Sequence, residues 1–165
     1  MRKTTGLMTA AAVGAALMMG AAPAQAADAG LTFKNSVSQM CLGLEVVQGI
    51  LTPHQASCAS YGTKWTFIKT SDEGGDLKAG RLVNDGFPVY CLDGNTEGTV
   101  YLSECNSSDP GQTWILSGQY GSLAHALSHK LLTGWGGGNV SAYTQPAYYG
   151  DLAKKQQWIF SRMPS

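Results

Sequence analysis

Three tryptophans, each followed by apolar residues, divide most of this chain into units of similar length. They lie in the segments TKWTFI, GQTWIL and QQWIFS, and the spacings between Trp65, Trp114 and Trp158 are 49 and 44 residues. A unit of this size is one small supersecondary structure that cannot bury its apolar face alone. We therefore expect the units to share one core around a pseudo-threefold axis. Each indole buries about 150–250 Å², so the three rings are the expected centre of that core.

The cysteines repeat in the same register as the tryptophans. Cys41 and Cys91 each precede a leucine and stand 24 and 23 residues before a tryptophan, and Cys58 and Cys105 follow in the same two units. Four cysteines allow three pairings, and the recurrence makes Cys41–Cys58 and Cys91–Cys105 the most economical one. Each would close a loop of about fifteen residues, which stabilises a fold by about 3 kcal/mol in the chain-entropy model. Zinc is the competing interpretation, but the sequence has no CxxC pair.

The rest of the sequence predicts an all-β fold. Short apolar segments such as LTF, WTFI, RLV, WILS and KLLT are separated by Gly, Asn, Asp, Ser and Pro. Many short strands with regular turn signals indicate a sandwich or barrel. The 21 glycines suit tight turns, and we expect turns at Asp72–Asp76 and Trp135–Asn139, where glycine gives access to positive φ.

The beginning of the chain predicts a secretory signal peptide over residues 1–26. Arg2 and Lys3 precede a short apolar run, and Ala24–Ala26 has the small residues of a cleavage site. The alternative is a membrane anchor, but the run is shorter than the ~20 residues of a spanning helix. Pro23 also interrupts its end.

After cleavage we expect a flexible N-terminus over residues 27–30 and a single domain over residues 31–165. The protein would then be secreted and extracellular, where disulfides form. The chain has 11 basic and 11 acidic residues and no basic cluster. This balance argues against nucleic acid and against an anionic membrane surface as partners. No later segment is apolar enough for membrane insertion.

Three units of the form Cys-Leu-Asp … Cys … Gln-x-Trp resemble the ricin B-type lectins. The resemblance covers about Leu31 to Arg162. It implies a β-trefoil of three repeats, or lobes, with pseudo-threefold symmetry and twelve strands, and a stand-alone, non-catalytic module that binds glycans of the galactose or xylose type without a cofactor. In this family a lobe can hold one shallow site. A carboxylate follows the first cysteine, an aromatic ring precedes the second cysteine by two residues, and amides lead into the Gln-x-Trp motif.

The first lobe lacks all three parts of such a site. Gly43 stands at the acid position, Ala56 at the aromatic position and Thr63 at the glutamine position. We expect this lobe to be structural.

The second lobe keeps two parts. Asp93 and Gln112 stand at the acid and glutamine positions, and Ser103 replaces the aromatic residue. Tyr101 could substitute for that ring, and Asn106 is a nearby amide. The structural alternative is that Asp93 caps the Asp-Gly-Asn turn and that Gln112 satisfies backbone groups at the start of a strand.

The third lobe has Tyr143 at the aromatic position and Gln156 at the glutamine position, with Thr133 in place of the acid. Packing alone is the alternative role for Tyr143, and backbone satisfaction for Gln156. Trp135 lies in a glycine-rich segment with Asn139. It would be either a stacking surface or a ring packed on the lobe in place of the missing disulfide.

The sequence carries no pattern of an enzyme or a metal site. It has no G-x-S-x-G elbow, P-loop or HExxH motif, and no paired carboxylates in a predicted cleft. His125 and His129 are four residues apart, and we expect both to be solvated rather than to bind zinc. The first hypothesis is therefore a lectin-like module without enzymatic activity. The second is a degenerate trefoil that binds a protein partner, as a protease inhibitor or as an accessory subunit of a toxin or enzyme.

Overall fold

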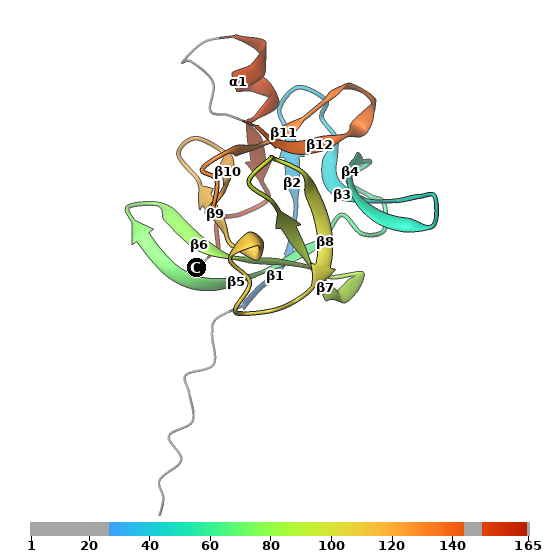
Figure 1. Ribbon diagram of the computed structural model, residues 1–165. Helices are drawn as coiled ribbons and strands as arrows, with labels where there is room; N and C mark the ends of the chain where they lie inside the picture. The colour runs from blue at the N-terminus through green and yellow to red at the C-terminus, as the bar shows by residue number, and fades with distance from the viewer. Residues whose placement is uncertain (1–26, 144–149, 165) are drawn as a thin grey trace, which may run out of the picture.

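The computed structural model describes residues 27–143 and 150–164, and strands dominate them (Figure 1). The predicted signal peptide, residues 1–26, lies outside the described residues. The elements in chain order are β1 (Ala27–Leu31), β2 (Phe33–Asn35), β3 (Cys41–Val47), β4 (Ile50–Ala56), β5 (Trp65–Gly74), β6 (Leu77–Asn84), β7 (Phe87–Gly94), β8 (Val100–Glu104), β9 (Trp114–Ser117), β10 (Ser122–His125), β11 (Leu131–Gly134), β12 (Val140–Tyr143), α1 (Asp151–Lys155) and β13 (Trp158–Phe160).

These elements form the expected β-trefoil. Lobe 1 comprises β1 to β5, lobe 2 comprises β6 to β9, and lobe 3 comprises β10 to β13 with α1. The last strand of each lobe pairs with the first strand of the next lobe: β5 with β6, β9 with β10, and β13 with β2. All these pairs are antiparallel, and they make the pseudo-threefold arrangement of lobes.

The three tryptophans occupy equivalent places in the core. Their side chains are at most 1% exposed. Each indole N–H donates a hydrogen bond of 2.9–3.0 Å to the carbonyl of a buried leucine two strands earlier, in the pairs Trp65–Leu42, Trp114–Leu92 and Trp158–Leu132. Around them, Phe33, Phe67, Leu82, Leu116 and Leu123 complete the core. The predicted shared core is confirmed.

A buried polar side chain lies opposite each tryptophan on the neighbouring strand. Its role is the same in every lobe: it hydrogen-bonds to the carbonyl of the residue just before the glutamine position. The pairs are Asn84 with Gly62 at 2.7 Å, Asn35 with Lys155 at 2.8 Å, and His125 with Gly111 at 3.1 Å. These contacts fix the loop that leads into each tryptophan strand.

Two expectations are wrong. Residues 27–30 are not a flexible segment, because Ala27–Leu31 forms β1 and pairs with β5. Together β1 and β2 take the place that β6 has in lobe 2, so these residues are needed for the first strand of lobe 1. His125 is not solvated either. It is fully buried, since it pairs with Trp114 and points into the core.

Both predicted disulfides are present, Cys41–Cys58 and Cys91–Cys105. The two glycine-rich turns also adopt the predicted backbone, with positive φ at Gly74, Gly75 and Gly137. Among the described residues, no helix is long and apolar enough to cross a membrane.

The β3–β4 hairpin extends away from the rest of lobe 1, on the opposite side of the view from the β5–β6 hairpin (Figure 1). Its turn is Gln48-Gly49, and both residues have positive φ, as a two-residue type I′ turn requires. Val46, Val47 and Ile50 next to this turn are 65%, 44% and 67% exposed. The hairpin tip, meaning these three side chains and the turn, is therefore apolar and open to solvent.

Candidate functional site

The strand register confirms that the sequence positions compared between lobes are equivalent in space. The position of the first cysteine pairs with the aromatic position in each lobe: Cys41 with Ala56, Cys91 with Ser103 and, in lobe 3, Leu131 with Tyr143. The acid position pairs with a second equivalent residue: Gly43 with His54, Asp93 with Tyr101 and Thr133 with Ser141. The three candidate sites therefore lie on the same face of the same hairpin in each lobe.

Lobe 1 has no room for an acid at its acid position. A Cβ atom added to Gly43 would stand 2.7 Å from Cγ2 of Thr63, the residue at the glutamine position. His54 carries the only titratable ring among the described residues of this hairpin, and its Nδ1 lies 3.2 Å from Oε2 of Glu45.

In lobe 2 the acid and glutamine positions are linked through a serine. The Ser103 hydroxyl donates to Oδ2 of Asp93 at 2.5 Å and accepts from Nε2 of Gln112 at 2.6 Å. Oδ1 of Asp93 also accepts the N–H of Gly94 at 2.7 Å. Asp93 is only 2% exposed, so its carboxylate is held by internal partners.

Gln112 has internal partners at both ends of its amide and is fully buried. Nε2 also donates to the Glu104 carbonyl at 2.8 Å, and Oε1 accepts the N–H of Asn106 at 2.8 Å. The side chain of Asn106 is exposed and accepts from the N–H of Ser108 at 3.0 Å. These contacts are the backbone-satisfying role that the sequence left as an alternative for Gln112.

Tyr101 is the part of lobe 2 that reaches the surface, with 39% of its side chain exposed. It lies across the strand from Asp93. Partial burial, and then the negative charge of Asp93, raise the pKa of the Tyr101 hydroxyl above its ordinary value. The hydroxyl is therefore a neutral group at physiological pH that can donate and accept hydrogen bonds.

In lobe 3 the corresponding contact is direct. Nε2 of Gln156 donates to Oγ1 of Thr133 at 3.0 Å, and both residues are buried. Thr133 Oγ1 in turn donates to the Leu131 carbonyl at 3.0 Å. The same two positions thus meet in all three lobes: by close approach in lobe 1, through Ser103 in lobe 2, and by one hydrogen bond in lobe 3.

Above this buried contact, lobe 3 carries two aromatic rings. Tyr143 is 47% exposed. It meets Trp135 edge to face, with ring centroids 5.5 Å apart and planes at 88°. The indole N–H of Trp135 donates to Oγ of Ser141 at 2.7 Å, and Nζ of Lys155 lies 5.4 Å from the centre of the indole, within the range of a cation–π interaction.

The Trp135–Asn139 turn is fixed from lobe 1. Nε2 of Gln55 donates to the carbonyls of Trp135 at 3.0 Å and Asn139 at 3.3 Å. Trp135 N–H donates to the Asn139 carbonyl at 2.8 Å. The backbone of Trp135 is thus anchored from another lobe, while its ring stays partly exposed next to Tyr143. Its role as a stacking surface stays a prediction.

Sequence reasoning missed Ser103 and Lys155 as parts of these sites. In the sequence Ser103 only replaces an aromatic residue, whereas in the fold its hydroxyl joins Asp93 to Gln112. Lys155 precedes Gln156 directly, and only the fold brings its amine over Trp135. Within residues 27–143 and 150–164, no group of three His, Cys, Asp or Glu side chains could hold a metal ion.

The sequence matches no model of a known protein family and no curated protein. Solved structures with the same fold do match. A lectin from Polyporus squamosus, in a structure bound to the human-type influenza-binding epitope Neu5Aca2-6Galb1-4GlcNAc, has a TM-score of 0.62 at 16% identity over 81% of this chain. The chain spans about half of that lectin, 49% of its length.

Two other neighbours are matched along nearly their whole length. A Caenorhabditis elegans protein of unknown function has a TM-score of 0.59 at 13% identity, covering 86% of this chain and 98% of that protein. A chain of the cytolethal distending toxin from Actinobacillus actinomycetemcomitans has a TM-score of 0.57 at 12% identity, covering 82% and 92%. These identities are low, and the likeness shows the fold.

Proposed function

We propose that this protein is a secreted, non-catalytic glycan-binding module and that lobe 3 holds its principal site. The observation that carries the proposal is the aromatic pair of Tyr143 and Trp135. It stands at the position where the lectin-like trefoils place a ring, and it remains partly exposed. A sugar has an apolar C–H face bordered by hydroxyls, so a rigid ring beside hydrogen-bonding groups suits it.

The groups around the pair are arranged for such a ligand. Tyr143 is about half exposed, and its edge-to-face contact with Trp135 limits the movement of both rings. Lys155 lies over the indole and supplies N–H donors at the rim of the site. The exposed Asn139 side chain at the end of the anchored turn is a further donor and acceptor. A pyranose ring resting on Tyr143 would lie next to Trp135, and further sugar units could extend toward Lys155 and Asn139.

Lobe 2 is the secondary site in this proposal. Its carboxylate, Asp93, already accepts hydrogen bonds from Ser103 and Gly94. A sugar would have to displace Ser103 to reach the carboxylate. Tyr101 is the accessible group, so lobe 2 offers a single ring without the second one that lobe 3 has.

Three further observations support the proposal. The solved structures of similar fold include a lectin in complex with a glycan epitope. Two disulfides and the leader-like beginning of the chain favour secretion. Nothing in the paired groups of the three hairpins offers an activated nucleophile, which favours binding over catalysis.

A single shallow site of this kind binds weakly. Hydrogen bonds to sugar hydroxyls replace bonds to water and contribute about 1 kcal/mol each. We therefore expect a dissociation constant of about 1 mM for a monosaccharide, corresponding to about −4 kcal/mol. Tighter binding to branched or clustered glycans would come from effective concentration when two lobes are engaged.

The test is a glycan array with the wild-type protein and two variants that exchange residues between equivalent positions. Tyr143→Ser gives lobe 3 the residue that lobe 2 has, and Tyr101→Ser gives lobe 2 the residue that lobe 3 has. Loss of one stacking contact of about 1 kcal/mol weakens binding about fivefold. We therefore expect Tyr143→Ser to lose at least 80% of the array signal and Tyr101→Ser to lose less. Equal binding by wild type and Tyr143→Ser would refute the lobe 3 site, and a silent array would refute the function.

The hairpin tip favours a second candidate function, the binding of a protein partner. Val46 and Val47 are neighbours on one strand, so they point to opposite faces of the hairpin, and both are exposed. Burying these two and Ile50 would contribute several kcal/mol. A secreted protein that copurifies with the wild type, but not with a Val46→Thr/Ile50→Thr variant, would support this candidate. Copurification that is equal for both would refute the tip as the contact.

A further inference from the structure

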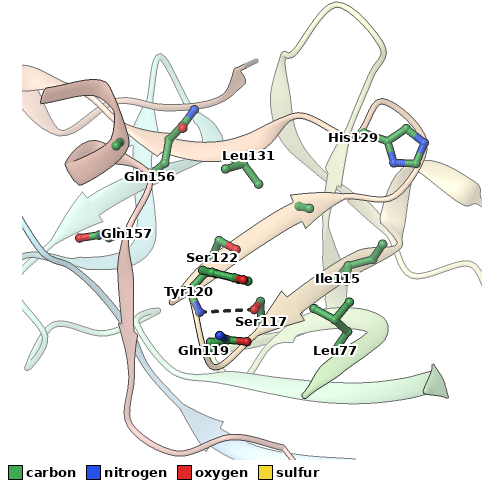
Figure 2. A pocket seen from close by; sticks show the side chains of 12 residues that line it. Leu77, Ile115, Ser117, Gln119, Tyr120, Ser122, His129, Leu131, Gln156 and Gln157 are labelled. Carbon is green, nitrogen blue, oxygen red and sulfur yellow. Dashed lines mark hydrogen bonds between the residues drawn. The ribbon is translucent and has the colours of Figure 1, made fainter. Parts of the chain in front are cut away.

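A groove separate from the three hairpin sites lies at the junction of lobes 2 and 3. It has a volume of about 670 Å³, which is within the range of small-ligand sites. Its floor is the outer face of the β9–β10 hairpin, and residues after α1 form one side (Figure 2). We call it the β9–β10 groove, and we propose that it is a second glycan-binding site that holds a neutral sugar unit.

The pleat of the two strands produces the floor. Trp114 and Leu116 of β9 point into the core, so Ile115 points outward, and Ala124 and Ser122 of β10 point outward in the same way. Ile115 pairs across the strands with Ala124, and Ser117 pairs with Ser122. Three of these four side chains are small, and this leaves the hollow.

The other two lobe junctions have larger side chains at the same places. At the junction of lobes 1 and 2, Val83 pairs with Thr66 and Arg81 pairs with Ile68. At the junction of lobes 3 and 1, Lys34 pairs with Ile159 in place of Ala124 with Ile115. The groove is thus a local departure from the threefold symmetry, produced by small residues on β10.

The rim carries polar groups. Tyr120 and Gln119 lie at the hairpin end, His129 lies at the opposite end, and Gln157 lies beside α1 (Figure 2). The Tyr120 side chain is 67% exposed. Its backbone N–H, rather than its hydroxyl, is bonded to Ser117, at 3.4 Å.

The side-chain amides of Gln119 and Gln157 and the hydroxyl of Ser122 make no hydrogen bond to another described side chain or backbone group, although the backbone N–H groups of both glutamines donate. No Asp, Glu, Lys or Arg is among the described lining residues. An apolar floor, an accessible phenol ring and unengaged amides match a ring that carries hydroxyls and no net charge.

The groove adjoins the lobe 3 site without being part of it. Gln156 lines the groove and also donates to Thr133, and Leu131 lines the groove and pairs with Tyr143. The choice of a sugar as ligand rests on the proposed function, whereas the place of the groove does not. Two adjoining sites would let lobe 3 and the groove contact successive units of one oligosaccharide.

Nuclear magnetic resonance tests the proposal. Lactose and xylobiose are titrated separately into the ¹⁵N-labelled protein up to about 20 mM, well above the ~1 mM expected for a weak single site. We expect saturable shifts of the amides of Gln119, Tyr120 and Ser122 with at least one sugar. Ala124→Lys copies the residue at the equivalent junction and should fill the groove. We expect it to raise the dissociation constant obtained from these shifts at least tenfold.

Lys34→Ala, the reverse exchange at the other junction, is the matched control and should leave the dissociation constant of the groove unchanged. Tyr120→Ala is a second groove variant and should weaken binding at least fivefold.

The outcomes separate this inference from the proposed function. Shifts near Tyr143 and Trp135 only, or groove shifts that persist in Ala124→Lys and Tyr120→Ala, overturn the groove and leave the lobe 3 site standing. Shifts in the groove only support the inference and overturn lobe 3 as the principal site. The absence of shifts with both sugars at both places overturns both.

Discussion

At the acid position the lobes carry Gly43, Asp93 and Thr133, and the residue present decides how the buried polar group below it is satisfied. In lobe 1, Gly43 leaves space for the methyl group of Thr63. In lobe 2, Gln112 donates to the Ser103 hydroxyl, and in lobe 3, Gln156 donates to Thr133 itself. A buried amide or carboxylate without a partner would cost about 1–3 kcal/mol. Asp93 already has internal partners, Ser103 and Gly94, so the exposed aromatic residues are the better candidates for contact with a ligand.

The Asp93 network depends on a glycine. A Cβ atom at Gly111 would lie 2.5 Å from Oδ1 of Asp93 and 2.8 Å from the Gly94 carbonyl. We expect Gly111→Ala to lower the free energy of unfolding by about 1–3 kcal/mol, as for other overpacked sites, measured by urea unfolding. Gly136→Ala is the control, since nothing lies within 4 Å of its Cβ position, and it should change stability by less than about 0.5 kcal/mol. Equal effects of the two variants would contradict the role of Gly111.

His125 predicts a dependence of stability on pH. Burial lowers the pKa of its imidazole below the ordinary 6.5, although the Gly111 carbonyl opposes this. The unfolded chain then binds a proton more readily than the folded one. The stability from neutral His125 is complete above about pH 6.5 and is lost as the pH falls toward the lower folded pKa.

His125→Asn, which installs the residue of the two other lobes, should therefore reduce the loss of Tm between pH 7.5 and pH 5. Thermal unfolding followed by circular dichroism at several pH values measures this difference. The same pH slope in both proteins would show that His125 does not titrate in this way.

At the scale of elements, lobe 3 closes its central hairpin without a disulfide. Lobes 1 and 2 link a cysteine in β3 or β7 to the loop after the next strand, through Cys41–Cys58 and Cys91–Cys105. Lobe 3 instead uses the hydrogen bonds of Trp135 within its turn and those from Gln55 in lobe 1. The turn that carries the proposed binding residues is therefore held by contacts between lobes.

Removing one disulfide should destabilise the fold, because the unfolded chain regains the conformational entropy that the closed loop had removed. The Cys91→Ala/Cys105→Ala variant is expected to lose about 2–4 kcal/mol in the free energy of unfolding, measured with guanidinium chloride. Because lobe 3 is anchored from lobe 1, glycan binding by the folded variant should remain within twofold of wild type. A loss of binding without unfolding would show that lobe 2 contributes more to the site than proposed.

At the scale of the whole molecule, the balance of 11 basic and 11 acidic residues suits a ligand recognised through neutral contacts. Binding of a neutral glycan should change by less than about twofold between 50 and 500 mM NaCl, because few ions are released on binding. Isothermal titration calorimetry at the two salt concentrations measures this. A tenfold weakening in high salt would point to an anionic ligand held by Lys155 or other cations.

The overall fold could be predicted from the sequence because Trp65, Trp114 and Trp158 repeat with their cysteines, and repeated units must share a core. Positions along one strand, such as Tyr143, were also predictable from spacing. The strand at residues 27–30 and the burial of His125 were not, since both depend on which strand pairs with which.

The partners within the sites could not be predicted for the same reason. Ser103 reaches Asp93 and Gln112 only in the register of β7 with β8. Lys155 ends α1, and its amine lies over Trp135 only because α1 packs against lobe 3. The small side chains of Ala124 and Ser122 form a hollow only because their strand pairs with β9.

The aromatic pair of lobe 3 can be tested directly by tryptophan fluorescence. The chain has four tryptophans, and three of them are at most 1% exposed, so Trp135 is the one that a bound sugar can reach. Titration with the glycan that binds best on the array should give a saturable change in emission. The account predicts that Trp135→Phe abolishes this change and that Tyr143→Ser moves its midpoint to at least about fivefold higher glycan concentration, the loss of one stacking contact, while the far-ultraviolet circular dichroism is retained. A change that persists in Trp135→Phe, or none in the wild type at saturating glycan, would contradict it.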